Sequence, residues 1–297
     1  MSDPPPLDDL LRGGQLFEAI AQATARVKAA PTDAATRAKL LELFCLSGEF
    51  DRAQKQLNVT ASGREKEPRL QLVHNCLKAE AARRQVFTAG RVPEVIADPS
   101  EEFKTRLKAA LTLQSGEETG EMLAAVNAAP GGPGTHGGEP FACLVDGDEL
   151  LGPYLEFLGS DGRYYWLDQS AIALVEPGPI ATVLDTIWRP CIIHQTNGSP
   201  MAGCLPAIYF GTAEADLPDD VRQAALLGYS TEWVRVGGVG RGLGQRTYFA
   251  ASGEGATDIA CLALQKVTFG SADTVADPAS DPAADADEAD EPEASDA

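Results

Sequence analysis

Apolar residues in the first 129 positions recur at the spacing of a helical face. Near the N-terminus, Leu16, Ile20, Ala23 and Val27 follow one another at intervals of four, three and four. This spacing places all four side chains on one side of an α-helix. The same period continues in later segments, which are separated by glycine and proline. The pattern predicts an α-helical domain over residues 7–129.

Two motifs in this domain repeat with a period of 34 residues. The sequences GQLFEA, from Gly14, and GEFDRA, from Gly48, each open a new predicted helix. A related stretch, GEETGE, starts at Gly116. The period, with a small residue at the turn between two helices, is similar to that of tetratricopeptide (TPR) repeats, whose concave faces bind extended or helical peptides. The alternative interpretation is a helical domain that only packs against the rest of the chain.

The pattern changes at the stretch PGGPGTHGG. It covers residues 130–138 and predicts a linker, because so dense a run of proline and glycine cannot continue a helix. After it, short runs of β-branched and aromatic residues alternate with turn sequences such as GSDG and TNGS. Residues 139–270 are therefore predicted to form a mainly antiparallel β domain with short helices. The expected fold class is α+β, with a TPR-like helical domain first.

Acidic side chains are unevenly distributed along the 297 residues. The formal net charge is −20, of which residues 1–129 carry −1, residues 130–270 carry −9 and residues 271–297 carry −10. The last segment consists mainly of Asp, Ala and Pro, and we predict a disordered acidic tail. Strong negative charge repels phosphates, which argues against nucleic acid or an anionic membrane as partner. The N-terminus lacks the basic and apolar regions of a signal peptide, so a cytoplasmic location is expected.

Cysteines and histidines offer little for a metal or catalytic site. The six cysteines are scattered without a C-x-x-C pair and are expected to be small buried residues. Cys191 and His194 lie three apart on a predicted strand, which directs their side chains to opposite faces. No nucleophile motif accompanies the three histidines. The sequence thus predicts no catalytic residue, no metal and no cofactor, with a hydrolase-like site built from carboxylates in the β domain as an alternative.

A glycine-rich stretch near the end of the β domain invites comparison with nucleotide-binding loops. Residues 237–249 read GGVGRGLGQRTYF. The glycine spacing fits neither the dinucleotide fingerprint nor the Walker motif, and a strand rather than a helix is predicted to follow. We interpret the stretch as a glycine-rich hairpin between the strands TEWVRV and QRTYF. Our structural hypothesis is a partly buried ion pair between Glu232 and Arg246, which flank this hairpin.

Short stretches of both predicted domains occur in an order that points to one protein family. They are LLRGGQLFEAI, GEFDRAQKQL and RLQLVHNCLKAEAARRQVF, followed by GEPF, LGPYLE, DGRYYWL, DTIWRP, TNG, STEW and GLGQR. Together, over residues 7–269, they resemble the ImpE family, also called TagJ or SciE-type, of bacterial type VI secretion. The resemblance implies a non-enzymatic accessory protein. It also implies that the protein binds the N-terminal segment of the small contractile-sheath subunit (TssB-like) and influences sheath assembly or disassembly with the ClpV ATPase.

The resemblance assigns no individual partner-binding residues, so their identity is unknown at this level. Two features depart from what the family leads us to expect. The stretch AIYFGTAEADLPDD differs from the family pattern, and the acidic tail is not a family feature. Besides the hydrolase-like enzyme, a generic TPR-type scaffold for another complex is the remaining alternative.

Overall fold

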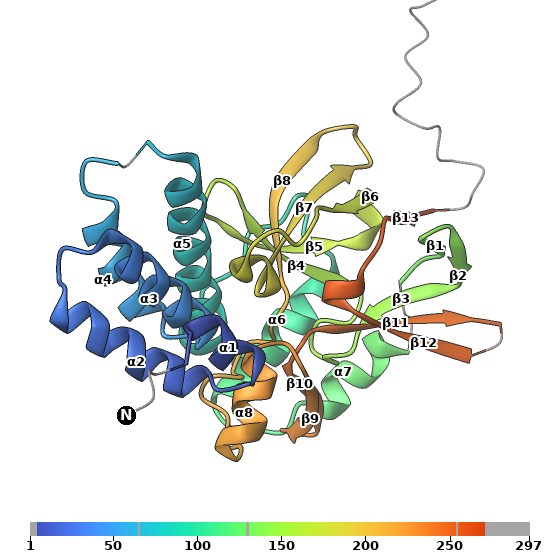
Figure 1. The fold of residues 1–297 in the computed structure, drawn as a ribbon. Coiled ribbons are helices and arrows are strands. Elements are labelled where there is room, and N and C mark those ends of the chain that lie inside the picture. Colours follow the sequence, from blue (N-terminus) through green and yellow to red (C-terminus); the bar gives the residue numbers. More distant parts are fainter. Residues whose placement is uncertain (1–4, 65, 129–130, 254, 271–297) are drawn as a thin grey trace, which may run out of the picture.

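The computed structural model describes residues 5–64, 66–128, 131–253 and 255–270, and in this part of the chain seven α-helices precede the first strand (Figure 1). The helices are α1 (Leu7–Arg12), α2 (Leu16–Ala29), α3 (Ala34–Leu46), α4 (Phe50–Thr60), α5 (Pro68–Ala89), α6 (Glu101–Gln114) and α7 (Gly120–Asn127). Each of the helices α1 to α6 packs against the next helix along the chain. None of the helices described is both long and apolar enough to cross a membrane. The predicted acidic tail, residues 271–297, lies outside the described residues.

Local sequence explains where several of these helices begin and end. Asp33 caps α3, because its side chain accepts a hydrogen bond from the Ala35 N–H. The three glycines of the repeated motif, Gly14, Gly48 and Gly116, have φ angles of 73°, 72° and 74°. Glycine adopts this left-handed conformation without the strain of a side chain, which suits it to the end of a helix. The sequence repeat therefore coincides with a repeated helix ending.

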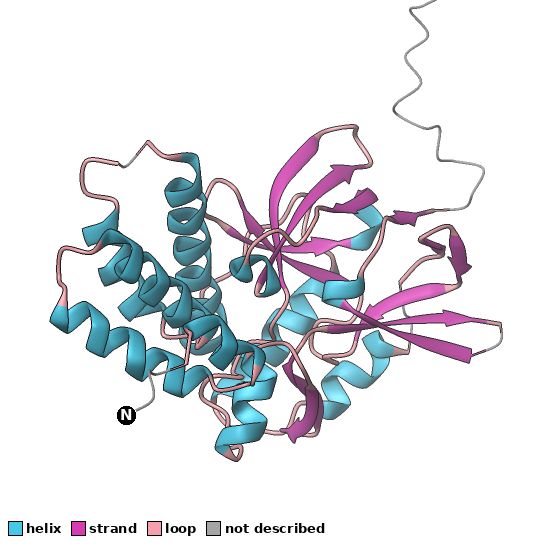
Figure 2. Cartoon of the chain, in the orientation of Figure 1, coloured by secondary structure: helices cyan, strands magenta, loops and turns pink. Residues whose placement is uncertain are grey.

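Antiparallel strands make up most of the second half of the chain (Figure 2). Eight of the described strands form one sheet in the order β2-β1-β13-β6-β7-β8-β4-β5, two form the hairpin β10-β9, and three form the sheet β12-β11-β3. A short helix, α8 (Asp219–Leu226), interrupts the strands, and the predicted α+β fold class is confirmed. The strands are β1 (Gly134–His136), β2 (Glu139–Phe141), β3 (Cys143–Asp146), β4 (Tyr154–Gly159), β5 (Tyr164–Asp168), β6 (Ile172–Pro177), β7 (Trp188–Gln195), β8 (Pro200–Pro206), β9 (Thr231–Val236), β10 (Val239–Gly244), β11 (Thr247–Ser252), β12 (Gly255–Ala260) and β13 (Val267–Phe269).

The segment predicted as a linker, residues 130–138, is not a linker throughout. Residues 134–136 form β1, which pairs with β13 on one side and with β2 on the other. Gly137 and Gly138 have φ angles of 59° and 96° and make the tight turn between β1 and β2. The glycines that end the helical pattern thus build a hairpin turn, and the linker prediction is corrected in this respect.

Helices and strands share one hydrophobic core. The rings of Phe87 in α5 and Phe103 in α6 lie 6.1 and 6.0 Å, centroid to centroid, from the ring of Trp166 in β5. Phe50 of α4 stacks on Trp188 of β7 at 6.1 Å. Large aromatic side chains contribute much of the stabilisation of such contacts. The helical and β parts therefore pack against each other through a common core, and a second buried cluster lies mainly among the strands.

Candidate functional site

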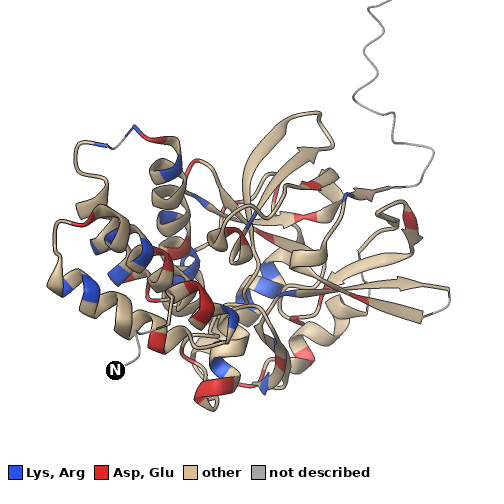
Figure 3. Ribbon diagram, viewed as in Figure 1, with Lys and Arg blue, Asp and Glu red and all other residues tan. Residues whose placement is uncertain are grey.

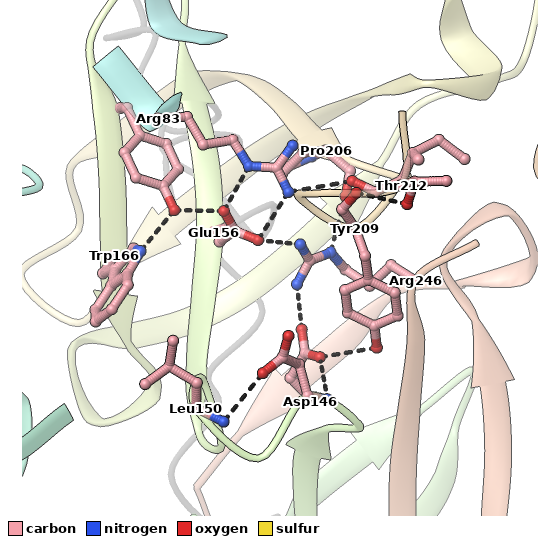
Figure 4. Close-up of polar contacts among 12 residues, drawn as sticks. Arg83, Asp146, Leu150, Glu156, Trp166, Pro206, Tyr209, Thr212 and Arg246 are labelled. Atoms are coloured by element: carbon pink, nitrogen blue, oxygen red, sulfur yellow. Dashed lines mark hydrogen bonds and ion pairs between the residues drawn. The ribbon is translucent and has the colours of Figure 1, made fainter. Parts of the chain in front are cut away.

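A network of buried charged side chains lies where the helical part meets the strands (Figure 4). At its centre is Arg246, between β10 and β11, whose side chain is completely buried. Its guanidinium forms ion pairs with Asp146 of β3 and Glu156 of β4, and its Nε donates to the Pro206 carbonyl at 2.8 Å. A buried arginine requires such partners, because an unpaired charge in a core is very costly.

Glu156 connects this arginine to helix α5. Its two carboxylate oxygens accept hydrogen bonds from Nε and Nη2 of Arg83, at 2.7 and 3.1 Å. The Tyr164 hydroxyl also donates to Glu156, and the Trp166 indole N–H donates to the Tyr164 oxygen at 2.6 Å. Arg83 further donates to the Ile208 carbonyl at 3.1 Å. Glu156 thus lies between two arginines, one from a helix and one from the strand region.

Asp146 has a different environment from Glu156. It accepts hydrogen bonds from the Tyr209 hydroxyl and the Asp148 N–H, each at 2.9 Å, besides its ion pair with Arg246. Asp148, itself buried, pairs with Arg241 of β10 at 2.7 Å. Asp146 therefore forms an ion pair with one arginine, whereas Glu156 forms ion pairs with two.

This difference separates the acidities of the two carboxyl groups. Burial alone would raise the pKa of Glu156, but the charges of Arg83 and Arg246 lower it to about 2. Burial raises the pKa of Asp146 to about 6, because the single charge of Arg246 does not offset the loss of solvation, and the nearby charge of Asp148 adds to the rise. Glu156 is the permanent anion of the network, and Asp146 is the group that titrates within it.

A dependence of stability on pH follows from Asp146. A carboxyl whose pKa is higher in the folded than in the unfolded chain stabilises the fold most below the unfolded pKa, near 4. That contribution is lost as the pH rises through the folded pKa, about 6. We expect the Asp146→Asn variant to show a weaker decline in the free energy of unfolding between pH 4 and pH 6 than the parent. Urea unfolding at several pH values measures this, and equal declines in the two proteins would contradict it.

The predicted pair of Glu232 and Arg246 is corrected by these contacts. Glu232 lies in β9 opposite Leu243 of β10, and no ion pair joins it to any described residue. Arg246 is indeed buried and paired, but its partners lie 100 and 90 residues earlier in the chain. One signal was available in the sequence: Glu156 is the single charge in the otherwise apolar run YLEFLG. The sequence around Asp146 and Arg83 contains no comparable signal that these side chains would be buried.

The glycine-rich stretch forms a strand and its turn. Gly237 and Gly238 are the two turn residues between β9 and β10, and the residues VGRGLG form β10 itself. A side chain at Gly242 would lie 2.3 Å from the ring of Tyr209, so glycine lets this ring pack flat against the strand and reach Asp146. The predicted hairpin between TEWVRV and QRTYF is therefore wrong in its pairing: TEWVRV pairs with the glycine-rich stretch itself, and the strand that contains TYF pairs with β12 and β3.

Cys191, His194 and His136 have separate environments and do not form a common metal site. Cys191 is buried in β7, while His194 Nε2 lies 3.4 Å from the carboxylate of Glu176. Nε2 of His136 accepts the Gln265 N–H at 3.0 Å. Within the residues described, no group of three or more His, Cys, Asp or Glu side chains is arranged to hold a metal ion.

Two surface hollows flank the N-terminal half of α5. One, of about 430 Å³, lies between α4 and α5 and includes Leu57, Leu70 and His74. The other, of about 530 Å³, lies between α5 and strands β6 to β8 and includes Leu72 and Ile192. Leu72 and Ile192 are each 41% exposed. The second hollow therefore presents apolar anchors from a helix and from a strand on the same surface.

Basic side chains are distributed unevenly between the helices and the large sheet. Figure 3 shows Lys and Arg concentrated on the N-terminal helices, with few charges on the large sheet. The apolar character of the second hollow agrees with this distribution.

The two-part arrangement also occurs in other proteins. A model of the ImpE protein family matches residues 138–268. The type VI secretion system accessory component TagJ of Pseudomonas aeruginosa is 34% identical over 251 residues, which cover 83% of this chain and 86% of TagJ. The crystal structure of a protein from Vibrio parahaemolyticus has the same fold, with a TM-score of 0.78 at 23% identity, over 89% of this chain and 97% of that one. Because the sequence similarity extends across the helices as well as the strands, the chain belongs to the ImpE/TagJ family.

Proposed function

We propose that this chain is a non-enzymatic accessory protein of the type VI secretion system. The observation that carries the proposal is its 34% identity to the accessory component TagJ over 251 residues. In detail, we propose that it binds the N-terminal segment of the small contractile-sheath subunit (TssB-like) in the cytoplasm. Through this binding it influences sheath assembly or ClpV-linked disassembly.

The environment of the acidic residues supports a non-enzymatic role. A general acid or base must reach its substrate. Asp146 and Glu156 are 3% and 1% exposed and are held by arginines, so their oxygens are enclosed by protein. This arrangement favours a structural task over the hydrolase-like alternative. An assay of the purified chain against generic ester, phosphoester and glycoside substrates tests this point, and any turnover removed by Glu156→Gln would contradict it.

The hollow between α5 and strands β6 to β8 is our proposed binding surface for the sheath segment. An amphipathic helix binds by placing apolar side chains of one face into an apolar groove. Leu72 offers such a contact from α5 and Ile192 offers one from β7. Ile180, 43% exposed, lies two residues beyond Gly178, which also lines the hollow. The Asn75 side chain donates to the Ser160 carbonyl at 2.6 Å and joins α5 to the strands at this site.

Two substitutions test the surface. We expect Leu72→Glu and Ile192→Glu each to weaken binding of a peptide of the sheath subunit's N-terminal segment by about tenfold or more, since a charge replaces an apolar anchor. Leu111→Glu on α6 is the matched control, because Leu111 is similarly exposed, at 39%, and does not line the hollow. Calorimetric or fluorescence titration of the full chain gives the affinities.

The outcomes of this titration separate the alternatives. Equal affinities for the parent and both hollow variants would place the binding surface elsewhere, with the hollow between α4 and α5 next to be examined. No saturable binding of the peptide to the parent would overturn the proposed partner and favour a scaffold for another complex. The effect on the sheath is tested separately, by measuring ClpV-driven sheath disassembly with and without the chain.

A further inference from the structure

Among the residues that the structure describes, no strand pairs with the edge of β9 that faces away from β10. Figure 1 shows the hairpin of these two strands at the periphery of the molecule, between α7 and α8. β9 pairs with β10 from Thr231 opposite Gly244 to Val236 opposite Val239, and in the part of the chain that is described these two strands form a sheet of their own. An unpaired edge of this kind is a template for pairing with another strand.

The hydrogen bonds of β10 identify which backbone groups of β9 face outward. Gly240 exchanges hydrogen bonds with Glu149, and Gly244 bonds Thr212 and Tyr209, so both glycines direct their backbone groups away from β9. In an antiparallel pair, opposite residues direct their backbone groups alike, and the direction alternates along the strand. Arg235 and Thr231 lie opposite these glycines, so their backbone N–H and C=O groups also point away from β10. The backbone groups of Trp233, which lies between them in the strand, point the same way. No described residue hydrogen-bonds the backbone of Trp233 or Arg235.

This edge also carries exposed apolar side chains. Trp233 and Val236 of β9 are 46% and 44% exposed, and Tyr229, two residues before the strand, is 60% exposed. Strands at sheet edges are ordinarily protected by proline, a bulge or charged side chains, lysine above all; β9 has no proline, bulge or lysine, and its two charges are Glu232 and Arg235. An exposed edge with apolar residues is therefore typical of an interaction surface.

The hairpin is held rigidly in position. The ring of Trp233 lies 5.8 Å from that of Phe249 and 5.9 Å from that of Tyr209. At the turn, the Gly237 carbonyl accepts hydrogen bonds from the N–H groups of Thr119 and Gly120, at 2.8 and 3.1 Å. A strand that is already ordered loses little conformational entropy on binding.

We propose that β9 pairs in an antiparallel manner with β9 of a second copy of this chain, across a two-fold axis at Val234. Outward-facing residues must lie opposite outward-facing residues. The register centred on Val234 satisfies this, because it sets Trp233 opposite Arg235 of the second copy and Arg235 opposite its Trp233. Both pairs bring a guanidinium to an indole ring, a favourable contact that the symmetry forms twice.

The charges of the strand agree with self-association. β9 carries one acid, Glu232, and one base, Arg235, so the contact itself joins two neutral segments despite the net charge of −20 of the whole chain. In the register centred on Val234, Glu232 lies opposite Val236 of the second copy, and no like charges lie directly opposite each other. Each Arg235 also has a Glu149 carboxylate 3.9 Å away in its own chain, which moderates the repulsion between the two arginines.

Sedimentation equilibrium of the full chain is the first test. The weight-average mass is expected to rise with concentration from 31.3 kDa, the mass of one chain, toward twice that value. A mass that stays at 31.3 kDa at every concentration overturns the proposal.

Cysteine cross-linking tests the register. Residue 234 lies opposite its own copy in a non-hydrogen-bonded pair, where the Cα atoms are about 4.5 Å apart, so Val234→Cys is expected to form a disulfide-linked dimer under mild oxidation. Val236→Cys is the matched control, since its copy lies four positions along the strand, about 13 Å away. Five of the six native cysteines are buried and Cys143 is partly buried, which keeps the background low. Equal cross-linking at both positions would indicate random collision and overturn the arrangement.

A pair of substitutions at Arg235 tests whether backbone pairing drives association. Arg235→Pro removes an outward N–H and leaves the bonds to β10 intact, and it is expected to abolish the rise in mass. Arg235→Ala keeps the N–H and is expected to weaken association less. Equal effects of the two substitutions would contradict strand pairing, and circular dichroism of both variants confirms that they are folded before they are compared.

Discussion

The Arg246→Gln variant is expected to lose about 3–5 kcal/mol of its free energy of unfolding, the usual consequence of removing one partner from a buried ion pair. Arg246 is completely buried and neutralises Asp146 and Glu156 together. Glutamine is neutral and shorter, so Asp146 would remain in the core without an arginine partner. Glu156 would keep only Arg83. Chemical denaturation at neutral pH, followed by circular dichroism, measures the loss.

Glu232→Gln provides the control for this prediction. Glu232 flanks the same hairpin but makes no ion pair with a described residue, so its substitution is expected to change the free energy of unfolding by about 0.5 kcal/mol or less. Similar losses in the two variants would restore the original hypothesis of a pair between Glu232 and Arg246. Because Glu156 also bonds Arg83 of α5, we expect Arg246→Gln to weaken the contact between helices and strands as well as the β part itself.

Replacing Gly244 with Ala is expected to cost about 2–4 kcal/mol, from the left-handed conformation of a residue with a side chain and from overpacking. Gly244 has a φ angle of 86°, and a Cβ atom there would lie 2.2 Å from the Ser230 carbonyl oxygen. A backbone atom cannot rotate away as a side chain can. The Gly244 N–H and carbonyl also bond Thr212 and Tyr209, at 2.8 and 2.9 Å, which holds this segment in place.

Gly253→Ala is the comparison for this substitution. Gly253 lies beyond β11, and a Cβ atom there would have no neighbour within 4 Å. Its replacement is expected to change stability by about 1 kcal/mol or less, in either direction. Thermal unfolding of both variants at the same pH measures the difference. A Gly244→Ala variant as stable as Gly253→Ala would show that the backbone near Ser230 can move to accept a side chain.

The sequence predicts the helices, with their buried faces and their ends, better than any other part of this structure. Leu16, Ile20 and Ala23 all lie on the buried face of α2, as their spacing indicates. Asp33 is the cap of α3, and the motif glycines Gly14 and Gly48 end helices. Each of these features depends on residues within one or two helical turns, so a local pattern contains the necessary information.

The sequence predicts that the second half of the chain forms antiparallel strands, but it does not predict how those strands pair. Runs of β-branched and aromatic residues indicate strands, but they do not state which strands pair. The segment 130–138 reads as a linker because of its composition, yet residues 134–136 pair with β13, more than 130 positions later. Likewise, the composition of the glycine-rich stretch suggests a loop, although residues 239–244 form β10, in which Gly242 lies against the ring of Tyr209.

The sequence by itself determined the N-terminal run of helices, the antiparallel β class, several helix ends and, through resemblance, the ImpE/TagJ family. Only the tertiary structure decided the partners of Arg246, the hairpin inside the predicted linker, the hollow beside α5 and the free edge of β9. The physical reason is the distance along the chain over which each feature is formed. Periodicity and capping act over a few residues, whereas Arg246 meets Asp146 and Glu156 across 100 and 90 residues, where only packing brings the charges together.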